Sequence, residues 1–168
     1  YHGAGDEGMC RTTYRVALAL AIVFGLLSIP LVPFGDWILS ETVASSDLLR
    51  DERAYFDILM LGAVGVYGQM AAASYFTGRG KTRVVFWANL IGNALNIALD
   101  PVLIFGWWGV PRLGIAGAAY ATIGAMFVQM VILVWAAGRK HFRVSSEAHG
   151  MMEVGGRILR FGVPAGLY

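Results

Sequence analysis

The sequence predicts an all-α fold, a polytopic bundle of membrane-spanning helices. Hydrophobic residues make up 57% of the 168 residues, charged residues only 14%, and the mean hydropathy is +0.61. Soluble domains of this length carry more charge. Crossing a hydrocarbon core of about 30 Å takes about 20 residues of helix. Four apolar runs are long enough, and they cover residues 16–34, 58–77, 84–108 and 113–138.

The first apolar run carries Pro30 and Pro33 near its end, where a missing backbone donor costs least or produces a local bend. The connection that follows, residues 35–57, is long enough to hold a short interfacial helix. Trp37 and Ile38 would lie against the lipid headgroups in such a helix.

The second run has glycines at spacing three, Gly62, Gly65 and Gly68, so one side of the helix is nearly free of side chains. Helices in lipid approach one another through such small residues, and we expect close packing here. Tyr67 and Gln69 are the polar side chains in the middle of this run. We consider both as candidates to line a cavity, with a hydrogen bond to a neighbouring helix as the alternative.

A polar stripe runs along the third helix, because Asn89, Asn93, Asn96 and Asp100 follow one another at i, i+4, i+7 and i+11. Their side chains lie within about 60° of one another and climb roughly 16 Å. An acid in a membrane normally faces a bundle interior or a watery cavity, where it marks an ion or substrate path. Pro101 releases a carbonyl one turn back, so we hypothesise that ion binding at Asp100 changes a bend there, with a static kink as the alternative.

The fourth run repeats the small residues and places Thr122 and Gln129, seven residues apart, on one face. We take Thr122 as a candidate ligand to an ion and Gln129 as a cavity-lining candidate. For Thr122 the sequence leaves open a hydroxyl bonded to the carbonyl four residues earlier in its own helix.

The basic residues predict the orientation of the helices. Residues 1–15, 78–83 and 138–160 hold ten of the 13 Lys and Arg residues, and the positive-inside rule places these segments in the cytoplasm. The helix of residues 84–108 then runs outward, and Asp100 lies in the outer half of its span.

Other kinds of site are disfavoured. His2, His141 and His149 lie in polar segments without metal-ligand spacing, and Cys10, also in a polar loop, has no partner for an internal disulfide. The segment GRGKT ends like a phosphate-binding loop, but Tyr75 stands where its first glycine would be. We therefore expect no organic cofactor, no nucleic-acid partner and no membrane-embedded enzyme.

Three stretches, FTGRGKT, NLIGNALNIALDPVLIFG and LGIAGAAYAT, resemble the N-terminal lobe of the multidrug and toxic compound extrusion (MATE) family of efflux transporters. The opening YHGAGD resembles the loop after the family's second helix, and RILRFGVPAGL the start of its seventh. The resemblance implies helices three to six of a twelve-helix protein with two six-helix lobes. Residues 1–137 would be a partial N-terminal lobe, 138–156 the cytoplasmic loop between lobes, and 157–168 the start of the C-terminal lobe.

The resemblance also implies a function. Family members expel cationic or amphipathic organic molecules in exchange for protons or sodium, and a bacterial inner membrane is the expected location. The cation site of similar prokaryotic transporters would use Asn96, Asp100 and Thr122, with Na⁺ or a proton as the ion, and Asn89 and Asn93 as cavity-lining candidates. Membrane lipid and a C-terminal lobe would be the partners. The alternative is a lipid-linked oligosaccharide flippase, whose cavity would be expected to carry several cationic residues.

Overall fold

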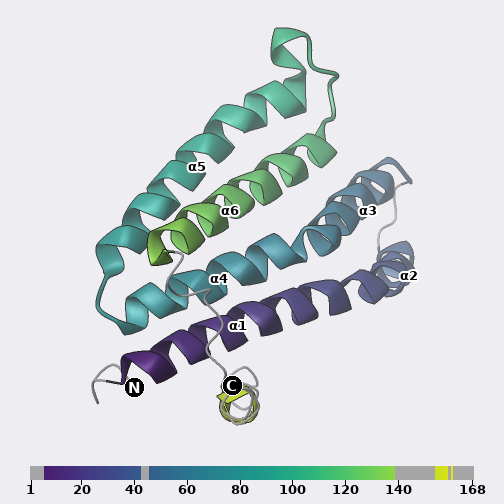
Figure 1. The fold of residues 1–168 in the computed structure, drawn as a ribbon. Coiled ribbons are helices and arrows are strands. Elements are labelled where there is room, and N and C mark those ends of the chain that lie inside the picture. The colour runs from purple at the N-terminus through teal and green to yellow at the C-terminus, as the bar shows by residue number, and fades with distance from the viewer. Residues whose placement is uncertain (1–5, 43–45, 139–153, 159, 161–168) are drawn as a thin grey trace.

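The computed structural model describes residues 6–42, 46–138, 154–158 and 160, and nearly all of them are helical (Figure 1). Two short 3-10 helices, η2 and η3, interrupt the α-helices, and residues 154–158 form a further helical turn. In chain order the elements are α1 (Glu7–Leu27), η2 (Ile29–Leu31), α2 (Val32–Thr42), α3 (Ser46–Leu61), α4 (Ala63–Gly78), α5 (Thr82–Phe105), η3 (Trp107–Gly109) and α6 (Ile115–Ala137).

The long helices lie side by side in the order α5, α6, α4, α1 (Figure 1). Helix α6 packs against both α5 and α4, whereas α4 and α5 contact each other sparsely. Helices α2 and α3 pack together at the far end of α1 from the N-terminus. Helix α6 is thus the shared neighbour of α4 and α5, the helices that carry polar residues of interest.

Three segments are long and apolar enough to cross a membrane, namely Glu7–Glu41, Thr82–Phe105 and Ile115–Ala137. A fourth crossing exists if the pair Leu48–Leu61 and Ala63–Gly78, bent by 51° at its break, is counted as one span. The all-α membrane-bundle prediction is confirmed.

The first predicted span, residues 16–34, begins too late. Helix α1 begins at Glu7, and its N-cap Asp6 accepts a hydrogen bond from the Met9 N–H at 2.9 Å. Residues 7–15, predicted as loop, are therefore helical, and Cys10 is buried in α1 rather than placed in a polar loop. The first turns hold because Tyr14 is buried in the core that α1 shares with α4, which extends the helix beyond its apolar stretch.

The second predicted span, residues 58–77, is wrong as a single straight helix, because it breaks at Gly62 between α3 and α4. The preceding connection, residues 35–57, is mostly helical: α2 occupies its start, and α3 begins at Ser46. Trp37 and Ile38 lie on α2 and are both exposed.

A charged cluster ties α1 to α4. The Arg79 guanidinium donates two hydrogen bonds to the Glu7 carboxylate, at 2.7 and 2.8 Å, and a third to the Tyr75 hydroxyl at 2.8 Å. These bonds to Glu7 raise the pKa of Arg79. The Tyr14 ring lies 4.5 Å from the Tyr75 ring, centroid to centroid, and completes the contact. The cluster thus holds the start of α1 against the end of α4.

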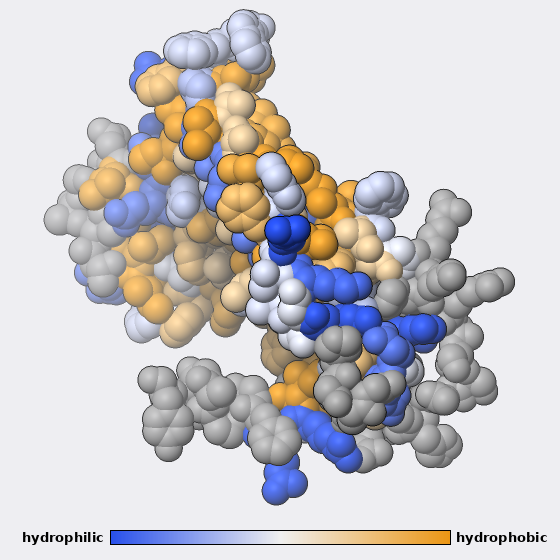
Figure 2. Space-filling view, turned by 90° about the vertical axis from the view of Figure 1, so that its left-hand side faces the viewer, coloured by the Kyte–Doolittle hydropathy of each residue, from blue (hydrophilic) through white to orange (hydrophobic). Residues whose placement is uncertain are grey.

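Hydrophobic and hydrophilic side chains gather on different parts of the surface. Figure 2 shows hydrophobic side chains over much of the upper part of one face, and hydrophilic side chains gathered lower down. The exposed cations Arg11, Lys81 and Arg83 lie near the start of α1 and at the α4–α5 turn. The predicted cytoplasmic segment 138–160 falls largely outside the described residues, of which residues 154–158 are helical.

Candidate functional site

The polar stripe lies along α5. Asn89, Asn96 and Asp100 are half-buried, whereas Asn93 is exposed on the surface of the described chain. Asn93 lies at the edge of the stripe, and the described helices leave it uncovered.

Two atoms of the stripe are buried without a hydrogen-bond partner among the described residues: Nδ2 of Asn96 and Oδ1 of Asp100. A buried polar atom normally has a partner, because leaving one unpaired costs about 1 to 3 kcal/mol. A carboxylate oxygen and an amide one turn apart on the same helix are groups that can hold a proton or ligate a hard cation. We regard these two residues as the centre of the candidate site.

Helix α6 carries the third candidate residue, Thr122. The contacts between α5 and α6 show how the two helices are aligned. A Cβ built on Gly117 would lie 2.5 Å from the Leu103 carbonyl oxygen, and one built on Gly124 would lie 4.0 Å from the Leu99 side chain. The helices are therefore antiparallel, and the register places Thr122 at the level of Asp100. Asn96 lies one turn from Asp100 on α5.

The Thr122 hydroxyl donates to the Ala118 carbonyl oxygen at 2.9 Å, which is the alternative that the sequence left open. This bond uses the hydroxyl proton but leaves lone pairs on the oxygen, so the oxygen remains able to accept a hydrogen bond or to ligate a cation. The hydrogen bond also fixes the rotamer of the side chain.

Polar side chains from three helices lie toward the start of α5 from Asp100. Gln69 Nε2 of α4 donates to Asn89 Oδ1 of α5 at 3.2 Å, which bridges two helices that otherwise touch little. Gln129 of α6 is 7% exposed and fills the space left by the missing side chain of Gly92. Gln69 therefore bonds a neighbouring helix, and the role of Gly92 carried no signal in the sequence beyond its small size.

Pro101 lies inside α5, which continues through it as one helix to Phe105. The helix ends at Gly106, whose left-handed φ of 78° lets its N–H bond the Val102 carbonyl oxygen at 3.1 Å. The proline therefore lies one turn before the end of the helix and directly after Asp100.

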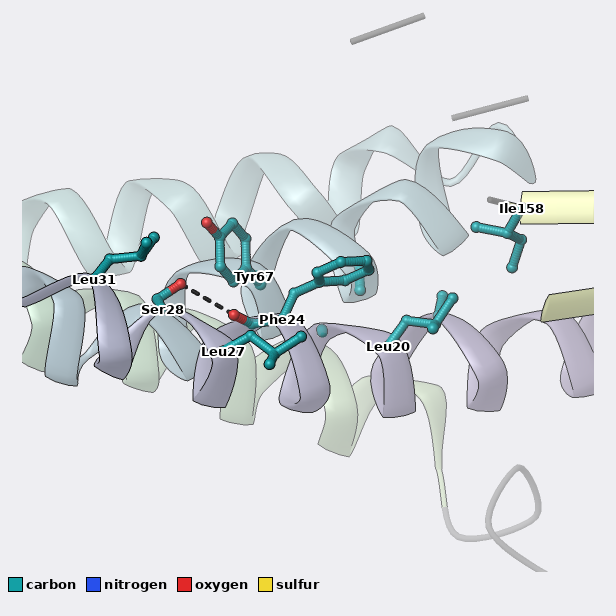
Figure 3. Close-up of a pocket in the computed structure, with 10 residues that line it drawn as sticks. Leu20, Phe24, Leu27, Ser28, Leu31, Tyr67 and Ile158 are labelled. Carbon is teal, nitrogen blue, oxygen red and sulfur yellow. Dashed lines mark hydrogen bonds between the residues drawn. The ribbon is translucent and has the colours of Figure 1, made fainter. Parts of the chain in front are cut away.

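Tyr67 lies away from the stripe. It lines a groove of about 550 Å³ between α1 and α4, together with Phe24, Ser28 and Ile158 (Figure 3). The Ser28 hydroxyl donates to the Phe24 carbonyl oxygen at 3.0 Å, and the rest of the lining is Ala and Leu. The volume is in the range of drug-sized pockets. Among the described residues its lining holds no cation, which the flippase alternative would be expected to require.

The chain is similar to proteins of one known family. The MatE family model matches residues 1–102. A probable multidrug resistance protein NorM of Deinococcus radiodurans is 30% identical over 99% of this chain and 37% of its own length. Multidrug resistance protein PmpM of Pseudomonas aeruginosa is 32% identical over 86% of this chain and 31% of its own length. Protein DETOXIFICATION 42 of Arabidopsis thaliana is 37% identical over 54% of this chain and 17% of its own length.

The fold has a solved counterpart, the inward-facing conformation of a multidrug resistance MATE family transporter of the MOP superfamily. The TM-score is 0.70 at 22% sequence identity, over 94% of this chain and 40% of that one. The chain thus spans only about a third of the length of the relatives it matches. The family match and the shared fold confirm the resemblance found in the sequence: this chain belongs to the MatE family.

Proposed function

We propose that this chain forms most of one lobe of a secondary active antiporter, which exports cationic or amphipathic organic compounds in exchange for protons or sodium ions. The observation that carries the proposal is the buried, unpartnered Asp100 oxygen on a helix long enough to span a membrane. The printed names of the relatives, multidrug resistance proteins, support the export of small molecules.

Each residue of the site has a separate role in this proposal. The Asp100 carboxylate holds the coupling ion, and neutral oxygens come from Thr122, near its level, and from Asn96, one turn away. Gln69, Asn89, Asn93 and Gln129 are amides that can exchange hydrogen bonds with water or with a polar group of the substrate. Pro101 leaves a carbonyl of α5 unbonded, so that the helix can change its bend when the charge at Asp100 is neutralised.

The groove at Tyr67 supplies a surface for the apolar part of an amphipathic substrate. Its wall of Ala, Leu and Phe side chains attracts apolar groups through the hydrophobic effect. The lining residues that the structure describes carry no charge, so the charge of a cationic substrate would be compensated elsewhere in the protein.

The proposed setting is the inner membrane of a bacterium, with the α4–α5 turn and the start of α1 in the cytoplasm. Membrane lipid surrounds the helices. The remaining helices of this lobe and a second lobe would cover the large apolar side chains that the described helices expose, among them Phe24, Ile97 and Trp135.

The test is transport by the full-length protein carrying Asp100→Asn, purified into liposomes with an imposed proton or sodium gradient and a fluorescent organic cation inside. We expect the variant to be produced normally, because removing a buried charge relieves about 2 to 3 kcal/mol on membrane-insertion scales. Gradient-driven export should fall to background.

Asp51→Asn is the matched control, because it makes the same change at a carboxylate whose side chain is 44% exposed. It should transport like the wild type. Wild-type export by Asp100→Asn under both gradients would contradict the proposal, since coupling would then have to lie outside this chain.

A further inference from the structure

The bend between α3 and α4 keeps its backbone hydrogen bonds. The Gly62 N–H donates to the Ile58 carbonyl oxygen at 2.9 Å, and the Gly62 carbonyl accepts from the Gly65 N–H, also at 2.9 Å. Both backbone groups of Gly62 are therefore satisfied although the helix axis turns by 51° between the two helices. Its φ of −85° is open to any residue, so the reason for a glycine here is not conformational.

The reason is space, because Ile123 of α6 packs onto Gly62. The three heavy atoms nearest to a Cβ built on Gly62 all belong to the Ile123 side chain, so even a methyl group would collide with it. Isoleucine is branched at Cβ and stiff about χ1, so it cannot swing aside as a longer, unbranched side chain would. The contact fixes α6 against the bend.

Ile123 is also the residue after Thr122. A displacement of the α6 backbone at Ile123 therefore moves the Thr122 oxygen, whose rotamer is fixed by its bond to Ala118. Because the register of α5 and α6 places Thr122 at the level of Asp100, the bend of α3 and α4 lies at the level of the candidate ion site.

We propose that Gly62 is a positioning residue for ion coupling: its contact with Ile123 fixes where α6 holds the Thr122 oxygen relative to Asp100, and so couples the α3–α4 bend to the ion site. This inference rests on the proposed function. It adds a residue on a third helix that touches neither ion nor substrate.

The same helix carries matched controls. Gly65 and Gly68 pack onto α6 as Gly62 does, but farther along α6 from Thr122. A Cβ on Gly65 would lie 2.7 Å from the Phe127 ring, and one on Gly68 would meet the sulfur of Met130. Methionine is unbranched and adapts readily, so Gly68→Ala is the milder control and Gly65→Ala the stricter one.

The experiment measures, in the full-length protein in liposomes, the ion concentration that gives half-maximal export and, separately, the substrate concentration that does so. The variants are Gly62→Ala, Ile123→Ala and the double variant. We expect each single change to weaken the apparent ion affinity by about tenfold, with little change in the substrate constant, because Thr122 is displaced in one and loosened in the other. In the double variant, the methyl group added at position 62 occupies space that Ile123 vacates, so the ion affinity should return to within about threefold of the wild type.

Three results would overturn the inference. The first is an unchanged ion affinity in both single variants, and the second is a double variant whose ion affinity is no higher than that of the single variants. The third is a loss of ion affinity in Gly65→Ala and Gly68→Ala as large as that in Gly62→Ala. If Gly62→Ala does not fold, Ile123→Val loosens the same contact by one methylene, and an unaltered ion affinity in it would also count against the inference. A failure of the proposed function is recognised differently, because Asp100→Asn would then still couple export to the ion.

Discussion

The Thr122 oxygen is the atom of the candidate site whose role depends most on the identity of the coupling ion. Its hydroxyl proton is bound by the Ala118 carbonyl oxygen of its own helix, so only the oxygen lone pairs face other groups. A sodium ion needs such neutral oxygens as ligands, whereas a proton needs only the Asp100 carboxylate. The two coupling ions therefore make different demands on this residue.

Thr122→Val keeps the shape of the side chain and removes the oxygen, whereas Thr122→Ser keeps the oxygen. If sodium is the coupling ion, we expect Thr122→Val to lose most sodium-driven export and Thr122→Ser to keep most of it, both measured in liposomes under an imposed sodium gradient. Export driven by a proton gradient alone should fall much less, because protonation of Asp100 needs no ligand oxygen.

Thr77→Val is the control, because the Thr77 hydroxyl donates to its own helix at Ala73 in the same way but lies at the C-terminal end of α4. Equal export by Thr122→Val and the wild type under both gradients would remove Thr122 from the site.

The residues of the stripe could be selected from the sequence, because a helix of known period places i, i+4, i+7 and i+11 on one side. The sequence alone did not predict which members are buried. Asn93 is exposed because it lies toward the edge of the stripe, away from α6. Gly62, Gly92 and Ile123 were not recognised as parts of the site, because their roles depend on the register between helices far apart in sequence.

At the scale of elements, α1 and α4 are joined by packing along their length and by the Glu7–Arg79 pair at their basic end. The Arg79 side chain is only 13% exposed, whereas that of Glu7 is 46% exposed. A bidentate pair of this kind is stronger than an isolated surface pair, because its geometry is fixed and Tyr75 also contributes to it.

Glu7→Gln should lower the stability of the protein by about 1 to 2 kcal/mol, because Arg79 keeps its charge in a largely buried place and loses a charged partner. The measurement is the thermal unfolding midpoint in detergent. Asp51→Asn should change stability by less than about 0.5 kcal/mol, because its pair with Arg50 is exposed and 3.9 Å long. Equal midpoints for Glu7→Gln and the wild type would show that the Glu7–Arg79 pair does not hold these helices together.

Helix α5 offers a second test at this scale. Pro101→Ala restores a backbone N–H that can bond the Ile97 carbonyl, so we expect a higher unfolding midpoint and slower export, because the helix loses its ability to bend beside Asp100. Pro111→Ala, a change at an exposed loop proline, should alter neither quantity. Faster or unchanged export by Pro101→Ala would mean that the proline is a static feature of the helix.

The boundaries of the elements were predictable where glycine ends a helix. Spans predicted at 84–108 and 113–138 became α5 (Thr82–Phe105) and α6 (Ile115–Ala137), and Gly106, Gly114 and Gly138 all adopt positive φ at their ends. The bend at Gly62 was not predictable, because a glycine within a small-residue run predicts close packing as readily as a break. The side chain that requires a glycine at the bend, Ile123, comes from another helix.

At the scale of the whole molecule, the described helices leave many of their large apolar side chains exposed. Ile97 is 72% exposed and Trp135 is 83% exposed. Such surfaces fit contact with lipid and with further helices, in keeping with a chain that spans about a third of its relatives' length. The proposed function requires these helices to hold Asp100 inside the membrane, with Thr122 near its level on α6 and Asn96 one turn away on α5.

The most direct test of that claim measures ion release when substrate binds. An antiporter whose substrate replaces an ion at Asp100 must release protons or sodium when an organic cation is added to the purified full-length protein in detergent. We predict release of about one ion per protein from the wild type and none from Asp100→Asn, with Asp51→Asn behaving as the wild type. Equal release from the wild type and Asp100→Asn would contradict the account, because the exchanged ion would then be held by other residues.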